Sequence, residues 1–178
     1  MISEQSKSSI SAALHRAAKT TLVRADTDVC EISSVSDRAE TINGSSLLLI
    51  TISSFVFRLL TIFEVSSAPS TQAYYAGTAA QPDISEQFAE FANMFCGALN
   101  RELSVHFPHM AMSIPYKLNG RCKTYLDGLR PQFRSTNDVI INDSVQVRAT
   151  LCMRCMSPVD IPVSVTEVDH SGGELELF

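Results

Sequence analysis

A carboxylate and a side-chain amide three residues apart, Glu90 and Asn93, are the residues of this chain best suited to act on a bound partner. If their segment is helical, residues at this spacing are neighbours on the helix surface. A carboxylate can pair with a cation, and an amide can donate a hydrogen bond to water and accept one without changing its charge. Gly97, one turn later, would let another backbone come close. The spacing therefore predicts a reactive or docking surface.

The segment 83–104 must be a helix for that surface to exist, and its apolar pattern predicts one. With about 100° between successive residues, apolar side chains gather on one side of the helix: Ile84, Phe88, Phe91, Phe95 and Leu99. The opposite side carries Glu86, Glu90, Asn93, Gly97 and Asn100. Pro82, Asp83 and Glu86 fit a capping box at the helix start. An ordinary solvated helix face also fits this pattern, although Asn and Gly are poor helix formers.

The composition suits one folded domain over residues 1–178. The chain is 45% hydrophobic, with a net charge of -5, which argues against a protein that binds nucleic acid by neutralising phosphates. The N-terminus lacks the basic and apolar regions of a secretory signal, so we expect a cytoplasmic protein. The segments 1–6 and 169–178 are expected to be mobile ends. The cysteines are scattered and odd in number, which suits reduced thiols: Cys30, Cys96, Cys122, Cys152 and Cys155.

Two segments allow more than one interpretation. Leu47 to Val65 is apolar enough to suggest a membrane span, but its polar residues and its content of Ile, Val, Thr and Phe favour two buried strands. Cys152 and Cys155, with two histidines near residue 107, could supply zinc ligands. Within a strand, however, their thiols would point to opposite faces, which favours small buried side chains and no metal site.

The order of the remaining elements predicts an α+β fold with an antiparallel sheet that carries long helices on one face. A helix is expected over 8–22, a polar stretch over 26–45, strands near 46–54 and 56–65, and a loop or short irregular helix over 66–82. After the helix 83–104 come a strand over 110–118, a basic loop over 117–134, and strands near 137–142, 145–156 and 160–168.

The basic loop contrasts with the acidic chain around it. It contains Lys117, Arg121, Lys123, Arg130 and Arg134, with Asp127 as its one acid. Such a run can be simply solvated, or it can steer an acidic partner. The tail over 166–178 is acidic and is expected to be mobile.

The second half of the chain resembles the signature of the CheX and CheC family of chemotaxis phosphatases. The resemblance rests on Glu90-x-x-Asn93-Met94-x-x-Gly97, followed 22 residues after the Asn by Ser113-Ile114-Pro115 and then by Gly120. In that family a long helix carries an acid, then Glu, then Asn, and a following strand ends in proline. The motif covers about residues 83–120, and elsewhere only the order of elements fits. The resemblance implies a CheC-like fold and a single CheX-like domain.

The resemblance also implies a reaction. Family members hydrolyse the phospho-aspartate of a CheY-like response regulator, which supplies its own Mg²⁺, so no cofactor is expected on this chain. By carry-over, Asn93 would orient the attacking water, Glu90 would pair with the regulator's active-site lysine, and Gly97 would permit close approach. Glu86 and Asn100 would belong to the partner-binding face, although Glu86 fits a helix cap equally well.

Some positions depart from the family pattern. Glu86 stands where the family usually has Asp or Ser, and the interval from Asn93 to Pro115 is about one residue short. CheC-type proteins carry a second motif on their first helix, but Glu4 is followed by Lys7 at the Asn position. A single motif resembles CheX, which implies a homodimer. The departures also leave open a non-catalytic module that docks a response regulator or a signalling complex.

Overall fold

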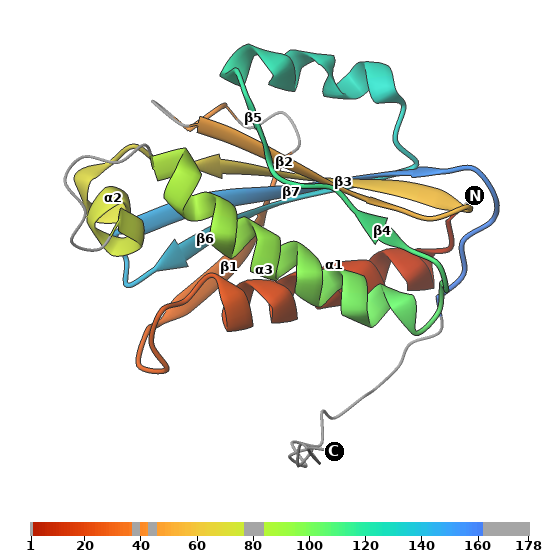
Figure 1. Cartoon of the computed structure of the whole chain (residues 1–178), viewed down its shortest axis with the longest axis horizontal. Helices are drawn as coiled ribbons and strands as arrows, with labels where there is room; N and C mark the ends of the chain where they lie inside the picture. Colours follow the sequence, from red (N-terminus) through yellow and green to blue (C-terminus); the bar gives the residue numbers. More distant parts are fainter. Residues whose placement is uncertain (1, 37–39, 43–45, 77–83, 162–178) are drawn as a thin grey trace, which may run out of the picture.

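The computed structural model describes residues 2–36, 40–42, 46–76 and 84–161. Within these residues, seven strands form one sheet in the order β1-β6-β7-β3-β2-β4, with β5 also paired to β2. Every strand pair is antiparallel. The long helices α1 and α3 lie along one face of this sheet (Figure 1). The predicted α+β fold is therefore confirmed.

The elements follow the chain in an order close to the predicted one. The helices are α1 (Glu4–Thr21), α2 (Pro69–Ala76) and α3 (Ile84–Ser104), with a 3-10 helix η1 (Gly120–Leu129). The strands are β1 (Cys30–Val35), β2 (Ser46–Ser53), β3 (Phe57–Val65), β4 (Ala111–Met112), β5 (Tyr116–Leu118), β6 (Phe133–Ile141) and β7 (Val145–Cys155).

The apolar run from Leu47 to Val65 forms the antiparallel hairpin β2–β3, as predicted. Alternate residues of each strand point to opposite faces, and both faces are covered here, so the run is apolar throughout. In the described part of the chain, no helix is both long enough and apolar enough to cross a membrane.

The two faces of the sheet have separate apolar clusters. The face beneath α1 and α3 holds the main core, which includes Leu14, Phe63, Phe95 and Val147. The opposite face, called the second face below, holds a small cluster of Leu47, Ile62, Leu126 and Cys152. Leu126 belongs to η1, so this short helix covers part of the second face (Figure 1). Burial on both sides fixes the register, because a one-residue slip would exchange the faces.

The start of the chain differs from the prediction. A frayed end was expected over residues 1–6, but α1 begins at Glu4, and the Ser3 side chain accepts a hydrogen bond from the Ser6 amide at 3.1 Å. Buried Ser6 in turn accepts a hydrogen bond from the Ile161 amide at 2.7 Å. The missed signal is a serine N-cap, which satisfies an otherwise unpaired helix amide.

Three further segments differ from the sequence-based expectation. The polar stretch 26–45 contains the edge strand β1, whose Cys30 and Ile32 pack against the core. The segment 66–82 contains the regular helix α2, which begins at Pro69, a favoured first helical residue. The basic loop forms η1 over much of its length. Short or edge elements depend on tertiary contacts, so local pattern detects them poorly.

The predicted strand 110–118 is interrupted. Its two parts, β4 and β5, both pair with β2, and the break falls at Ser113–Pro115. Proline has no amide hydrogen to contribute to a ladder, which explains the break. The predicted strand 160–168 lies almost entirely outside the described residues, as do the tail 169–178 and the capping residues Pro82 and Asp83.

Candidate functional site on the outer face of α3

Aromatic packing fixes α3 on the sheet. The Phe63 ring of β3 contacts the rings of Phe88 and Phe95 edge-on, with centroids 5.5 and 5.1 Å apart. Tyr75 of α2 contacts Phe88 and Phe91 from the other side, each with centroids 4.9 Å apart. Such pairs add a geometric preference to the burial of apolar area. The rotation of α3 about its axis is therefore set by the stripe that the sequence predicted.

This rotation places the polar residues of α3 outward. Glu86, Glu90 and Asn93 are exposed, and Met94 beside them is 45% exposed. Glu90 and Asn93 are one turn apart on the same surface, so both can touch one partner at once. The arrangement offers a carboxylate and an amide on a rigid helix, which suits ion pairing and the orientation of a water molecule.

The later part of the predicted face is less open. Gly97 and Asn100 are half-buried, and the Asn100 Oδ1 atom is buried without a hydrogen-bond partner. A Cβ atom built on Gly97 would meet only the Arg101 guanidinium, at 4.0 Å. The fold itself therefore does not require glycine at this position. Of the five predicted site residues, Asn100 has the weakest claim to an outward role.

An ion pair ties α3 to α1. The Arg16 guanidinium donates to both carboxylate oxygens of Glu102, at 2.6 and 3.3 Å. Such a bidentate pair has a defined geometry, and the Glu102 carboxylate also raises the pKa of Arg16. On the inner side of α3, burial raises the pKa of the Cys96 thiol to about 12. Cys96 is therefore a neutral packing residue.

The motif segment Ser113-Ile114-Pro115 lies at the break between β4 and β5. The Ser113 hydroxyl accepts a hydrogen bond from the Thr51 amide at 3.0 Å and donates to the Ile114 carbonyl at 2.9 Å. Ile114 itself is 72% exposed. The serine thus holds the segment against β2. Gly120 begins η1, and a Cβ atom there would meet nothing within 4 Å.

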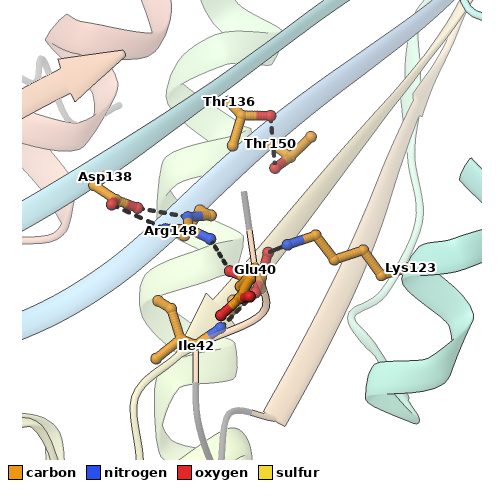
Figure 2. Close-up of polar contacts among 8 residues, drawn as sticks. Glu40, Ile42, Lys123, Thr136, Asp138, Arg148 and Thr150 are labelled. Atoms are coloured by element: carbon orange, nitrogen blue, oxygen red, sulfur yellow. Dashed lines mark hydrogen bonds and ion pairs between the residues drawn. The ribbon is translucent and has the colours of Figure 1, made fainter. Parts of the chain in front are cut away.

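A polar network on the second face was not predicted. Buried Glu64 of β3 pairs with Lys123 of η1 at 2.7 Å and accepts a hydrogen bond from the Ile42 amide at 3.1 Å. Arg148 of β7 donates to both carboxylate oxygens of Asp138 on β6 (Figure 2). The sequence signal for this network was a charged residue within each of two apolar runs, Glu64 and Arg148. Buried charges need partners, and those partners lie far away in sequence.

The basic loop is therefore only partly solvated. Lys123 pairs with Glu64, and Arg134 pairs with Asp127 at 2.6 Å. The side chains of both cations are 14% exposed. Arg121 and Arg130 are exposed, in agreement with the solvated interpretation. The loop contributes contacts to the fold, because two of its cations neutralise carboxylates.

The chain matches no protein-family model and no curated protein. Solved structures do match it. A chain of the CheX-CheY-BeF3-Mg+2 complex from Borrelia burgdorferi is 10% identical with a TM-score of 0.60, over 83% of this chain and 96% of that one. A CheC-like chemotactic protein from Shewanella oneidensis is 10% identical with a TM-score of 0.54, again over 83% and 96%.

A third match belongs to another kind of protein. The middle domain of FliM from Vibrio alginolyticus is 7% identical with a TM-score of 0.51, over 81% of this chain and 90% of that one. Together with the sheet order and the two long helices, these matches define the class of fold. The chain has the fold of the CheX and CheC-like chemotaxis proteins.

Proposed function

We propose that this protein is a phosphatase that hydrolyses the phospho-aspartate of a CheY-like response regulator. The observation that carries the proposal is the joint exposure of Glu90 and Asn93 on one turn of α3. The fold likeness to a chain in a CheX-CheY complex supports the choice of partner. Chemotaxis or a related two-component pathway in the cytoplasm is the setting that we infer, and a homodimer is part of the proposal.

The reaction transfers a phosphoryl group from an aspartate oxygen to water. Catalysis of phosphoryl transfer depends mainly on positioning and on stabilisation of charge. We assign the positioning of the attacking water to the Asn93 amide, which can donate to and accept from water at once. Placing the water in line with the breaking bond lowers the entropic part of the barrier. The Mg²⁺ would be held by the regulator.

Glu90 has a separate role in this proposal. Its exposed carboxylate would pair with the lysine of the regulator's active site and hold α3 over the phosphoryl group. Exposed Glu86 would add to the partner-binding face at the N-terminal end of α3. Gly97 has no side chain and would therefore allow the partner's backbone to approach closely. The fold of this chain does not itself require glycine at this position.

A non-catalytic docking module is the second candidate function. The likeness to the middle domain of FliM favours it, because the fold then also occurs in a protein other than the CheX and CheC-like chemotaxis proteins. Glu86 and the short interval from Asn93 to Pro115 also depart from the phosphatase pattern. In this alternative, α3 would bind a regulator or a signalling complex without hydrolysis.

The decay of a phosphorylated CheY-like regulator separates the two candidates. The intact protein should shorten the lifetime of the phospho-aspartate, and Asn93→Ala should lower the rate at least about tenfold. Because Asn93 is exposed and alanine is the better helix former, the variant should unfold at or slightly above the wild-type temperature. Gln5→Ala, which removes an exposed amide from α1, is the matched control. Binding of the phosphorylated regulator with an unchanged lifetime would reject the enzyme.

Glu90→Ala tests the pairing with the regulator's lysine. Binding to the phosphorylated regulator should weaken, while the rate at saturating concentration should fall less than in Asn93→Ala. The comparison of affinity with maximal rate separates docking from positioning of water. An unchanged apparent affinity would remove Glu90 from the interface.

A further inference from the structure

Two arginines stand directly opposite each other on the second face of the sheet. Arg58 of β3 is in register with Arg154 of β7, and both are exposed. The Cβ atoms of such a pair lie about 5 Å apart and on the same face. Like charges at this spacing repel each other. Within the described parts of the chain, neither guanidinium is paired with a carboxylate.

Strand register extends this pair into a row of residues. Ser53 of β2 is opposite Arg58, and Ala111 of β4 is opposite Ser53. Thr51, two residues before Ser53, points to the same face of the sheet. Small and hydroxyl side chains of β2 and β4 thus lie on one side of Arg58, and Arg154 lies on its other side.

A pocket of about 380 Å³ opens beside this row. Its lining includes Thr51, Ser53, Arg58, Ser113 and Tyr116. Arg154 lies outside the lining, opposite Arg58 on the next strand. The Ser113 hydroxyl is occupied by backbone contacts. The hydroxyls of Thr51, Ser53 and Tyr116 form no hydrogen bond to another described residue. The pocket therefore offers free donors next to uncompensated positive charge.

We propose that Arg58, Arg154, Thr51 and Ser53 bind the phosphate group of a small phosphorylated molecule. Guanidinium groups match the spacing of phosphate oxygens and bind them with two parallel hydrogen bonds. A bound phosphate would also remove the repulsion between the arginines. The pocket is open to solvent, so a phosphate group can reach the Arg58 side chain directly. The site lies on the face away from α3, so it goes beyond the proposed function.

Titration with inorganic pyrophosphate at constant ionic strength tests the site. Calorimetry should show saturable binding of one ion, with a dissociation constant of about 1 mM or lower. Arg58→Gln and Arg154→Gln should each weaken binding at least about tenfold, because each removes a charge-assisted pair. Both side chains are exposed, so the variants should keep the wild-type unfolding temperature.

Arg121→Gln is the matched control. It removes an exposed arginine from the start of η1, beyond the Leu47 end of β2. Ser53 and Leu47 are about 20 Å apart along that strand. Binding to Arg121→Gln should stay within about twofold of wild type. Equal weakening in all three variants would reveal only general attraction by charge and would overturn the proposal. Absence of saturable binding would overturn it too, even if an acidic protein bound the same face.

Discussion

Glu64 and Lys123 form an ion pair 2.7 Å long that fastens η1 to the second face of the sheet. The Glu64 side chain is 1% exposed and the Lys123 side chain 14% exposed, so water screens the pair poorly. Removing one partner from a buried pair leaves a charge that is neither solvated nor neutralised. The pair is thus a requirement of the fold around η1.

Glu64→Gln should lower the free energy of unfolding by about 3 kcal/mol, because it removes one charge of an ion pair whose two side chains are poorly solvated. Denaturation by urea at neutral pH measures the change. Glu102→Gln is the control, since it breaks a pair in which the Arg16 side chain is 50% exposed and the Glu102 side chain 35% exposed. It should cost less than about 1 kcal/mol. Equal effects of the two substitutions would contradict the distinction between buried and exposed pairs.

Gly97→Ala should separate stability from partner binding. An alanine Cβ would meet only the Arg101 guanidinium, at 4.0 Å, and alanine favours a helix by about 1 kcal/mol over glycine. The variant should therefore unfold at a higher temperature than wild type. If a partner backbone approaches this surface, its affinity should fall at the same time. Unchanged affinity for the phosphorylated regulator would count against close approach at Gly97.

Asp28 should make stability depend on acid pH. The hydroxyl of Tyr74 and the side chain of Asn142 donate to its carboxylate, at 2.5 and 2.7 Å. These hydrogen bonds lower the pKa of Asp28 to about 2. A lowered folded-state pKa gives a contribution that is complete above the unfolded value, about 3.9, and disappears as the pH falls through about 2.

Comparison of wild type with Asp28→Asn checks this window. The two proteins should differ most in denaturant midpoint above about pH 4 and should converge toward pH 2. A difference that stays constant across this range would show that the carboxylate's charge does not matter. Tyr74→Phe, which removes the strongest of these donors, should reduce the pH dependence in the same window.

Cys96 should resist alkylation in the folded protein. Its side chain is fully buried, and burial raises its pKa to about 12, while only the thiolate reacts with iodoacetamide. Half-buried Cys122 should react faster at pH 8. Mass mapping of the labelled cysteines, before and after denaturation, measures both rates. Labelling of Cys96 at the rate of Cys122 would indicate that α3 opens readily from the sheet.

The sequence alone determined the elements with strong periodicity. The apolar stripe of α3 specified both the helix and the side that faces solvent. Apolar residues spaced three and four apart fall on one face of a helix, which leaves the opposite face to solvent. The hairpin β2–β3 and strand β7 were also predicted, since β-branched and aromatic residues filled runs of strand length. The outward position of Glu90 and Asn93 follows from these local patterns.

The tertiary structure determined the strands and ion pairs that are formed by residues far apart in the sequence. Strand β1 exists because β6 supplies its hydrogen bonds, and β4 and β5 exist because β2 does. The pair of Glu64 with Lys123 and the register of Arg58 with Arg154 join residues from separate segments. Periodicity reports which side of an element is apolar, but only the packed sheet determines which charges meet across it.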